Sequence, residues 1–267
     1  MEHELGLTAL FNQYLAGPGN ALRHLIGLSS PTDRPWDNSV VMEILVVALL
    51  VITVAILRSS LSVDKPGKLQ HIFEMFNEFF TGTVDEVGIH HGKKYIPYIG
   101  TIFIFILSMN LIGIIPAFES PTNSPWVPAG LAVVTFLYFN AMGFQAHGIK
   151  YLAHFAGPVR FPHPLGNAAI IIFMCFIEVI SLFIRPLSLT VRLYGNMFAG
   201  EQVTTVFRSG LGFPTLWANL SKLVLPVGAM GLHVFVALIQ AYVFFLLTTI
   251  YIGLATAHEG EAAADGI

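Results

Sequence analysis

The chain has 267 residues, of which 55% are hydrophobic and only 11% are charged, and its mean hydropathy is +0.71. A soluble protein of this length would need far fewer apolar residues to form its core, so we expect a membrane protein. The apolar runs are about 18 or more residues long and lack the alternation of barrel strands, which favours helices. The predicted fold class is therefore an all-α membrane protein. The formal net charge of −3 argues against a nucleic-acid partner.

The first 38 residues have a mixed composition that includes Pro31 and Pro35. We expect residues 1–38 to form an extracytoplasmic surface segment with a short amphipathic piece near Leu22–Leu28. The start of the chain is acidic and is not followed by a compact apolar stretch with a small-residue cleavage site, which argues against a removable signal peptide. The segment carries no motif, so its role is open at this point.

Long apolar runs then predict five transmembrane helices within a membrane domain of residues 39–257. The predicted spans are about 39–57, 95–118, 127–145, 164–207 and 220–257. At about 1.5 Å per residue, each of the last two exceeds a hydrocarbon core of about 30 Å, so each must tilt strongly or bend. The turn-rich residues 209–214 between them indicate a hairpin. An acidic tail, residues 258–267, follows the last span.

Two segments outside the spans have amphipathic patterns. Between Lys65 and Gly92, apolar side chains from Ile72 to Phe80 fall at helical spacing among charged and polar ones. This pattern predicts a helix lying on the membrane surface rather than crossing it. Residues 148–155 have a similar pattern over a shorter length, so we expect a second surface helix there.

Basic residues in the short connections predict the orientation of the spans. The connection after the first span is rich in them: Arg58, Lys65, Lys68, Lys93 and Lys94. The connection after the second span has no Lys or Arg, whereas the one after the third contains Lys150 and Arg160. Because positively charged loops stay in the cytoplasm, we expect the N-terminus outside and, with five spans, the C-terminus in the cytoplasm.

Polar residues inside the last two apolar segments are the most informative part of the sequence. They are Glu178, Arg185, Arg192, Asn196 and Glu201 in the first of the two, and His233, Gln240 and Tyr251 in the second. An arginine at membrane depth costs at least about 2.5 to 3.5 kcal/mol on insertion scales. Residues of this kind in a membrane helix therefore indicate a functional site.

The helical period places these polar residues on defined faces. At about 100° per residue, Arg192 and Asn196 share a face, and Glu201 points to the opposite side. His233, Gln240 and Tyr251 form one stripe on the last helix. If the two helices are antiparallel neighbours, we expect Gln240 level with Arg192 and His233 level with Glu201.

The predicted orientation puts Glu178 toward the cytoplasm, Arg192 near mid-membrane, and Glu201 with His233 toward the outside. Glutamate and histidine side chains can take up and release protons, whereas arginine stays protonated and cannot relay them. The sequence therefore predicts two proton half-channels separated by Arg192, which acts as a barrier and as a counter-ion for a carboxylate that arrives on a partner.

The same residues lie in motifs that resemble the family of bacterial F-type ATP synthase subunit a. The motifs are Arg192-Leu-Tyr-Gly-Asn-Met-Phe-Ala-Gly-Glu201, preceded by Pro186-Leu-Ser-Leu, then His233-x6-Gln240-Ala-Tyr-Val-Phe, and Met109-Asn-Leu-Ile-Gly-Ile-Ile-Pro116. The resemblance extends from about the first span to Tyr251. It implies a non-catalytic stator subunit of the membrane sector that couples proton translocation to rotation of a ring of c subunits for ATP synthesis.

Roles of single residues follow from the resemblance position by position. Arg192 matches the essential arginine that faces the carboxylate of the ring, and Asn196 and Gln240 match its polar neighbours. Glu201 and His233 match the outer half-channel pair, and Glu178 matches a polar position of the inner half-channel. Some members of the family have an aspartate at the position of Gly113, so no proton role is assigned there.

The resemblance also implies the partners and the location of the chain. The implied partners are the c-ring, subunit b of the stator and, indirectly, the F1 sector, and the implied location is the bacterial plasma membrane. A phosphate-binding loop of the form G-x-x-x-x-G-K-[ST] is absent from the sequence, so no nucleotide is expected on this chain. No cofactor or metal is expected either. The coupling ion, H⁺ or Na⁺, and the number of ring subunits are not encoded here.

Several residues have a structural interpretation beside the functional one. Glu178 could pair with Arg185 two turns away, and Arg185 could instead reach a lipid headgroup or water. Asn196 and Gln240 could serve only as hydrogen-bonding contacts between helices. A stand-alone transporter is the alternative for the whole chain, although the internal repeats common in that class are not visible. A membrane hydrolase lacks its motifs.

Overall fold

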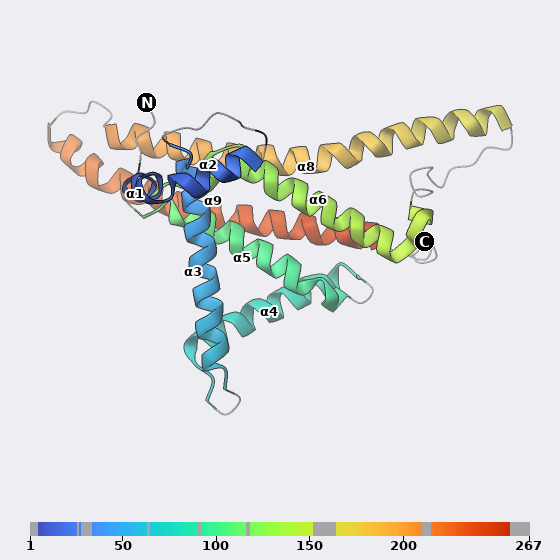
Figure 1. The fold of residues 1–267 in the computed structure, drawn as a ribbon, viewed down its shortest axis with the longest axis horizontal. Coiled ribbons are helices and arrows are strands. Elements are labelled where there is room, and N and C mark those ends of the chain that lie inside the picture. Colours follow the sequence, from blue (N-terminus) through green and yellow to red (C-terminus); the bar gives the residue numbers. More distant parts are fainter. Residues whose placement is uncertain are drawn as a thin grey trace. The chain divides into compact units, whose positions relative to one another are not determined.

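The computed structural model describes residues 5–25, 27, 34–62, 65–89, 92–115, 118–151, 164–209 and 215–256. Among them, the side chains of residues 150, 164–169, 201, 203–209, 215–226 and 229 are not described. Throughout these ranges the chain forms helices and connecting turns, and no strand (Figure 1). The predicted all-α class is confirmed. The tail, residues 258–267, lies outside the described residues.

Eight α-helices and three short 3-10 helices make up the part of the chain that the structure describes. In chain order they are α1 (Gly6–Tyr14), α2 (Ala16–Leu25), α3 (Asn38–Ser60), α4 (Lys68–Glu86), η1 (Gly92–Lys94), α5 (Ile96–Ile112), η2 (Pro121–Asn123), α6 (Trp126–His147), η3 (Gly148–Lys150), α8 (Pro164–Ser209) and α9 (Thr215–Thr256). Their order matches the order of apolar and amphipathic segments in the sequence.

Four of the described helices contain a stretch that is long and apolar enough to cross a membrane. These stretches are Asn38–Ser60, Trp126–His147, Ile170–Gly200 and Met230–Thr256, and α5 is a shorter apolar helix. On α3, aliphatic side chains such as Val51 and Ile52 are more than half exposed, which suits lipid and not water. A multi-pass membrane protein is confirmed, and the fifth span, in α5, stays a prediction.

The chain divides into two compact units. Unit 1 comprises residues 1–71, 103–127 and 193–241, and unit 2 comprises residues 72–102, 128–192 and 242–267. Helices α5, α8 and α9 each contribute a substantial part to both units, and α4 and α6 begin in unit 1 and continue in unit 2.

In unit 1, Trp36 attaches the N-terminal helices to the start of α3. Its backbone N–H donates to Oδ1 of Asn12 (3.0 Å), its indole N–H donates to the carbonyl of Leu15 (2.8 Å), and its ring packs edge-on against Phe11. The sequence predicted one amphipathic piece near Leu22–Leu28, whereas the structure has two short helices, of which α2 ends at Leu25. These contacts explain why a segment of mixed composition is ordered.

In unit 2, the amphipathic helix α4 is present as predicted. Its buried residues include Phe80, whose ring lies 5.2 Å from that of Phe245 on α9. A Cβ at Gly100 of α5 would come within 2.9 Å of the Phe80 ring, so the glycine allows α5 to approach α4 closely. The polar side chains Glu74 and Glu78 of α4 are exposed, as expected for a helix whose second face meets water or headgroups.

Helices α8 and α9 are 46 and 42 residues long. In unit 1 they run antiparallel, because Asn196 of α8 bonds Gln240 of α9 and His233 lies beside Gly200, nearer the C-terminus of α8. The predicted hairpin is therefore confirmed. Helix α8 continues through Pro186, which has no N–H for the carbonyl one turn before it. Its length of roughly 70 Å, at about 1.5 Å per residue, requires strong tilt or extension beyond the lipid.

Candidate functional site

The C-terminal end of α5, in unit 1, carries a buried polar network. The last four carbonyls of a helix have no partner within the helix. Here Ser120 donates its hydroxyl to the carbonyl of Met109 (2.9 Å), and the carbonyl of Asn110 lies 3.2 Å from Nε2 of His233. Backbone N–H groups of Ile114 and Ile115 donate to the other two carbonyls. The end of α5 is thus closed by a serine and a histidine from other elements.

The network continues through side chains of the connection that follows α5. Thr122 donates to Oδ1 of Asn110 (2.9 Å), and the hydroxyls of Thr122 and Ser120 lie 2.7 Å apart. Asn110 and Thr122 are fully buried, and Ser120 is nearly so. Next to Ser120, Glu119 accepts a hydrogen bond from Nδ2 of Asn38 (3.2 Å). We call Asn110, Ser120, Thr122 and His233 the Asn110 network.

The contact to Asn110 fixes the tautomer of His233. A backbone carbonyl can only accept, so Nε2 of the imidazole must carry the proton and donate it. In the neutral ring, Nδ1 is then the nitrogen that can accept a proton. Nδ1 points toward α8, where it would lie 3.5 Å from a Cβ at Gly200.

A cavity of about 210 Å³ lies between α8 and α9 at this level. It is lined by Asn196, Met197, Ala199, Gly200, Leu232, His233 and Val236. Two of the predicted site residues, Asn196 and His233, therefore border one space. Two turns beyond His233 on α9, the buried side chain of Gln240 accepts a hydrogen bond from Nδ2 of Asn196 (2.8 Å). The sequence placed Gln240 level with Arg192, and its observed partner is Asn196, one helical turn away.

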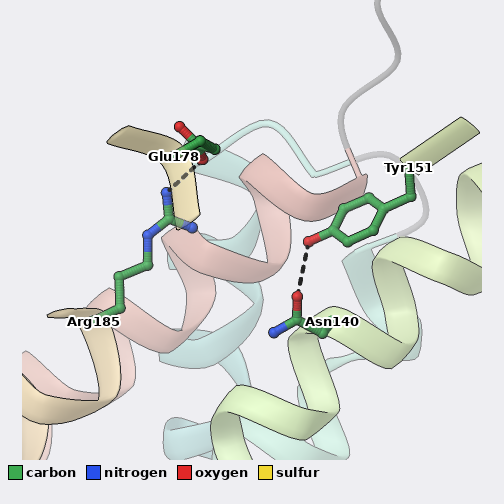
Figure 2. Close-up of polar contacts among 4 residues, drawn as sticks. All are labelled: Asn140, Tyr151, Glu178 and Arg185. Atoms are coloured by element: carbon green, nitrogen blue, oxygen red, sulfur yellow. Dashed lines mark hydrogen bonds and ion pairs between the residues drawn. The ribbon is translucent and has the colours of Figure 1, made fainter. Parts of the chain in front are cut away.

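Unit 2 contains a second polar group, centred on Arg185 of α8. Figure 2 shows its guanidinium directed at Glu178, and Nη2 lies 3.6 Å from Oε1 of the carboxylate. The same guanidinium lies 5.0 Å from the centre of the Tyr251 ring on α9, a cation–π distance. The ion pair that the sequence left as one interpretation of Glu178 is therefore present.

Tyr151, which follows η3, adds a phenol to this group. Its hydroxyl donates to Oδ1 of Asn140 on α6 (3.2 Å), as Figure 2 shows. Burial raises the pKa of the Tyr151 phenol above its usual value near 10, with a lowering contribution from Arg185 and a raising one from Glu178. The phenol therefore stays protonated at neutral pH and acts as a hydrogen-bond donor. We call Asn140, Tyr151, Glu178, Arg185 and Tyr251 the Arg185 cluster.

Arg192 differs from Arg185 in its surroundings. Its side chain is partly buried on α8, and among the residues that the structure describes it has no hydrogen-bond or ion-pair partner. Glu201 lies in α8 nine residues later, but its side chain is outside the described part of the chain. The structure thus brings together His233, Asn196 and Gln240 in unit 1, and Glu178 with Arg185 in unit 2.

Sequence reasoning did not assign roles to five residues of these two groups. They are Asn110, Ser120 and Thr122 in the Asn110 network, and Asn140 and Tyr151 in the Arg185 cluster. Asn110 lies within a quoted motif, and its position at the end of an apolar run was a usable signal. Tyr151 and Asn140 meet only through the turn after α6, which no periodicity encodes.

Comparisons with known proteins agree with the motifs. The family model of the ATP synthase A chain matches residues 40–253. The chain is 50% identical to ATP synthase subunit a of Solibacter usitatus, over 94% of this chain and all of the relative. It is 47% identical to ATP synthase subunit a of Koribacter versatilis, over 97% and 99% of the two chains, and 39% identical to that of Geotalea daltonii, over 78% and 82%. The chain therefore belongs to the ATP synthase A chain family.

Proposed function

We propose that this chain is the stator channel subunit of the F0 sector of a bacterial F-type ATP synthase. It provides two proton half-channels, one on each side of Arg192, and couples proton flow to rotation of a c-ring for ATP synthesis. The chain itself binds no nucleotide and catalyses no bond-breaking step. Its family membership and the two polar groups described above support this proposal.

Arg192 is the observation that carries the proposal. A partly buried guanidinium in an apolar helix is expensive unless an anion neutralises it. Within the described part of the chain no such anion contacts Arg192, so its counter-ion is best sought on a partner. A carboxylate of the c-ring would lose its proton on reaching Arg192 and regain one after passing it.

In this proposal, the two polar groups form the proton paths on the two sides of Arg192. His233, Asn196 and Gln240, with Glu201, form the outer half-channel, and the cavity beside Nδ1 of His233 gives water access to that nitrogen. Glu178 belongs to the inner half-channel. Along α8, Glu178 precedes Arg192 by 14 residues and Asn196 follows it by four. A proton that passes through both halves releases about 2.3 kcal/mol per 100 mV of membrane potential.

The proposal also sets the orientation and the assembly. The multi-pass chain lies in the bacterial plasma membrane with its N-terminus outside and its C-terminus in the cytoplasm, as the basic loops predict. Residues 1–38 then lie on the outer surface. Subunit b holds the chain as a stator, and the F1 sector is linked to it only indirectly.

The test is proton pumping driven by ATP in inverted membrane vesicles that carry the complex with Arg192→Ala. We expect pumping to fall to background while the chain remains in the membrane at its normal level. Arg58→Ala is the matched control, because Arg58 is an exposed arginine in the last turn of α3. Coupled pumping at the normal rate by Arg192→Ala would overturn the proposal.

A further inference from the structure

Arg185 has two neighbours of different chemistry that hold its guanidinium from two helices. Glu178, seven residues earlier on α8, supplies a carboxylate at 3.6 Å. Tyr251 of α9 supplies a ring face at 5.0 Å. The side chain of Arg185 is 22% exposed and that of Glu178 is 37% exposed, so the acid is the more accessible side chain of the pair. A cation held by two contacts therefore lies beside a more accessible acid.

The Tyr251 ring holds the Arg185 guanidinium in place whether Glu178 is ionised or protonated. Attraction between Arg185 and Glu178 disappears when the carboxylate takes up a proton. The contact of the guanidinium with Tyr251 does not depend on that proton, because it arises from the ring quadrupole. The guanidinium therefore remains beside Glu178 and favours renewed loss of the proton.

Tyr151 connects the Arg185 cluster to α6. A Cβ at Gly143 would lie 2.5 Å from the Tyr151 ring, so the ring packs directly on α6 at a glycine. The phenol is bonded to Asn140 and feels the charges of both Arg185 and Glu178. Tyr151, which packs on α6, thus lies within electrostatic reach of the ion pair.

We propose that Arg185 is a positioning residue for Glu178, and that Tyr251 is the anchor that holds Arg185 in place. This inference rests on the proposed function, in which Glu178 lies on the inner proton path, and it gives Arg185 a part in that path. Arg185 carries no proton itself. It orients the Glu178 carboxylate and keeps a positive charge beside it, so that protons leave Glu178 without delay.

The test uses conservative and disruptive variants in the assembled complex, with pumping driven by ATP as the readout. Arg185→Gln removes the charge, and we expect a roughly two- to tenfold lower rate, a modest effect because the ion pair is partly exposed. Arg185→Lys keeps a cation that can face both the acid and the ring, so it should restore most of the rate. Tyr251→Phe keeps the ring face and should pump several-fold faster than Tyr251→Leu, which removes it.

A double-variant comparison separates positioning from a merely structural contribution. If Arg185 acts through Glu178, Arg185→Gln should cause no further loss in a chain that already carries Glu178→Gln. If Arg185 only stabilises the helix or binds a lipid headgroup, the two losses multiply, because neither role depends on Glu178. Multiplicative losses therefore overturn the inference.

The outcome is distinguishable from a failure of the proposed function. If the chain is not a proton-conducting stator, pumping by the complex does not depend on Arg192 at all. If only the present inference is wrong, Arg192→Ala still abolishes pumping while Arg185 and Glu178 act independently. The amount of chain in the membrane, measured for every variant, excludes loss of assembly as the cause of a low rate.

Discussion

Asn196 of α8 and Gln240 of α9 are joined by one amide–amide hydrogen bond of 2.8 Å. Gln240 is 1% exposed, and its Nε2 has no partner among the described residues, whereas Asn196 is exposed. A buried amide N–H that lacks a partner is costly, so a polar group or water is expected to reach it. The hydrogen bond links α8 to α9, and it leaves the Nε2 donor of Gln240 buried between the two helices.

Replacing Gln240 by leucine should weaken the contact between α8 and α9. Amide contacts between membrane helices contribute about 0.6 kcal/mol on average and up to about 1.7 kcal/mol. We expect Gln240→Leu and Asn196→Leu each to lower pumping, and the double variant to be no worse than the poorer single one. Pumping assays with both single variants and the double variant check this expectation, and multiplicative losses would show that the two amides act separately.

Substitution of Gly143 tests the packing of the Tyr151 ring against α6. A Cβ at this position would lie 2.5 Å from the phenol ring, so Gly143→Ala must displace Tyr151 from Asn140. Overpacking of this kind typically costs about 1 to 3 kcal/mol. Thermal unfolding of the purified complex in detergent should show a lower midpoint. Gly130→Ala, in the same helix with open space around it, is the matched control and should leave the midpoint unchanged.

The hydrogen bonds of the Asn110 network predict the effect of replacing Thr122 on the stability of the chain. Thr122→Val keeps the shape of the side chain but removes the donor to Oδ1 of Asn110 and the contact with Ser120. Because these groups are buried, the unpaired amide should destabilise the chain by about 1 to 3 kcal/mol. Thr101→Val on the exposed side of α5 removes only a bond to its own helix and serves as the control in the same unfolding experiment. Equal effects of the two substitutions would contradict the assignment.

Side-chain volume at residue 200 should control access to His233. A Cβ there would lie at an ordinary distance of 3.5 Å from Nδ1, so Gly200→Ala should be tolerated. Gly200→Leu adds branches that extend into the cavity of about 210 Å³ and should cover the proton-accepting nitrogen. We expect pumping to fall with Gly200→Leu while the amount of assembled chain stays constant. A normal rate for this variant would show that protons do not pass through the cavity.

The sequence was sufficient for the helical class and for the hairpin of α8 and α9, because long apolar runs and a turn-rich segment determine both. It also singled out His233, Asn196 and Gln240, because polar residues in such runs are rare, and the structure brings these three together in unit 1. Their role in proton transfer stays a prediction. The sequence placed Gln240 opposite Arg192, one turn from its observed partner. The sequence does not determine the path of the connection between the two helices. The depth at which their side chains meet can therefore be predicted only to within about one helical turn.

The remaining site residues depend on features that periodicity does not carry. Ser120 and Thr122 follow the end of α5 in an irregular connection, and they were not recognised because such a segment reads as an ordinary loop. Their contacts arise from unpaired carbonyls at a helix end, which require tertiary neighbours to become visible. Tyr151 and Asn140 are eleven residues apart across the turn after α6, and only the folded turn brings the phenol to the amide.

The close approach of Gly113 to Ser120 has an evolutionary consequence. A Cβ at residue 113 would lie 2.9 Å from the Ser120 Cβ and 3.0 Å from its backbone nitrogen. An acidic side chain therefore cannot enter this position by a single substitution while the turn keeps its present path. A larger residue at position 113 would need a differently shaped connection, so we expect residue 113 and the turn around residue 120 to change together. With the present path of the turn, the buried hydroxyls of Ser120 and Thr122 and a side chain at residue 113 exclude one another.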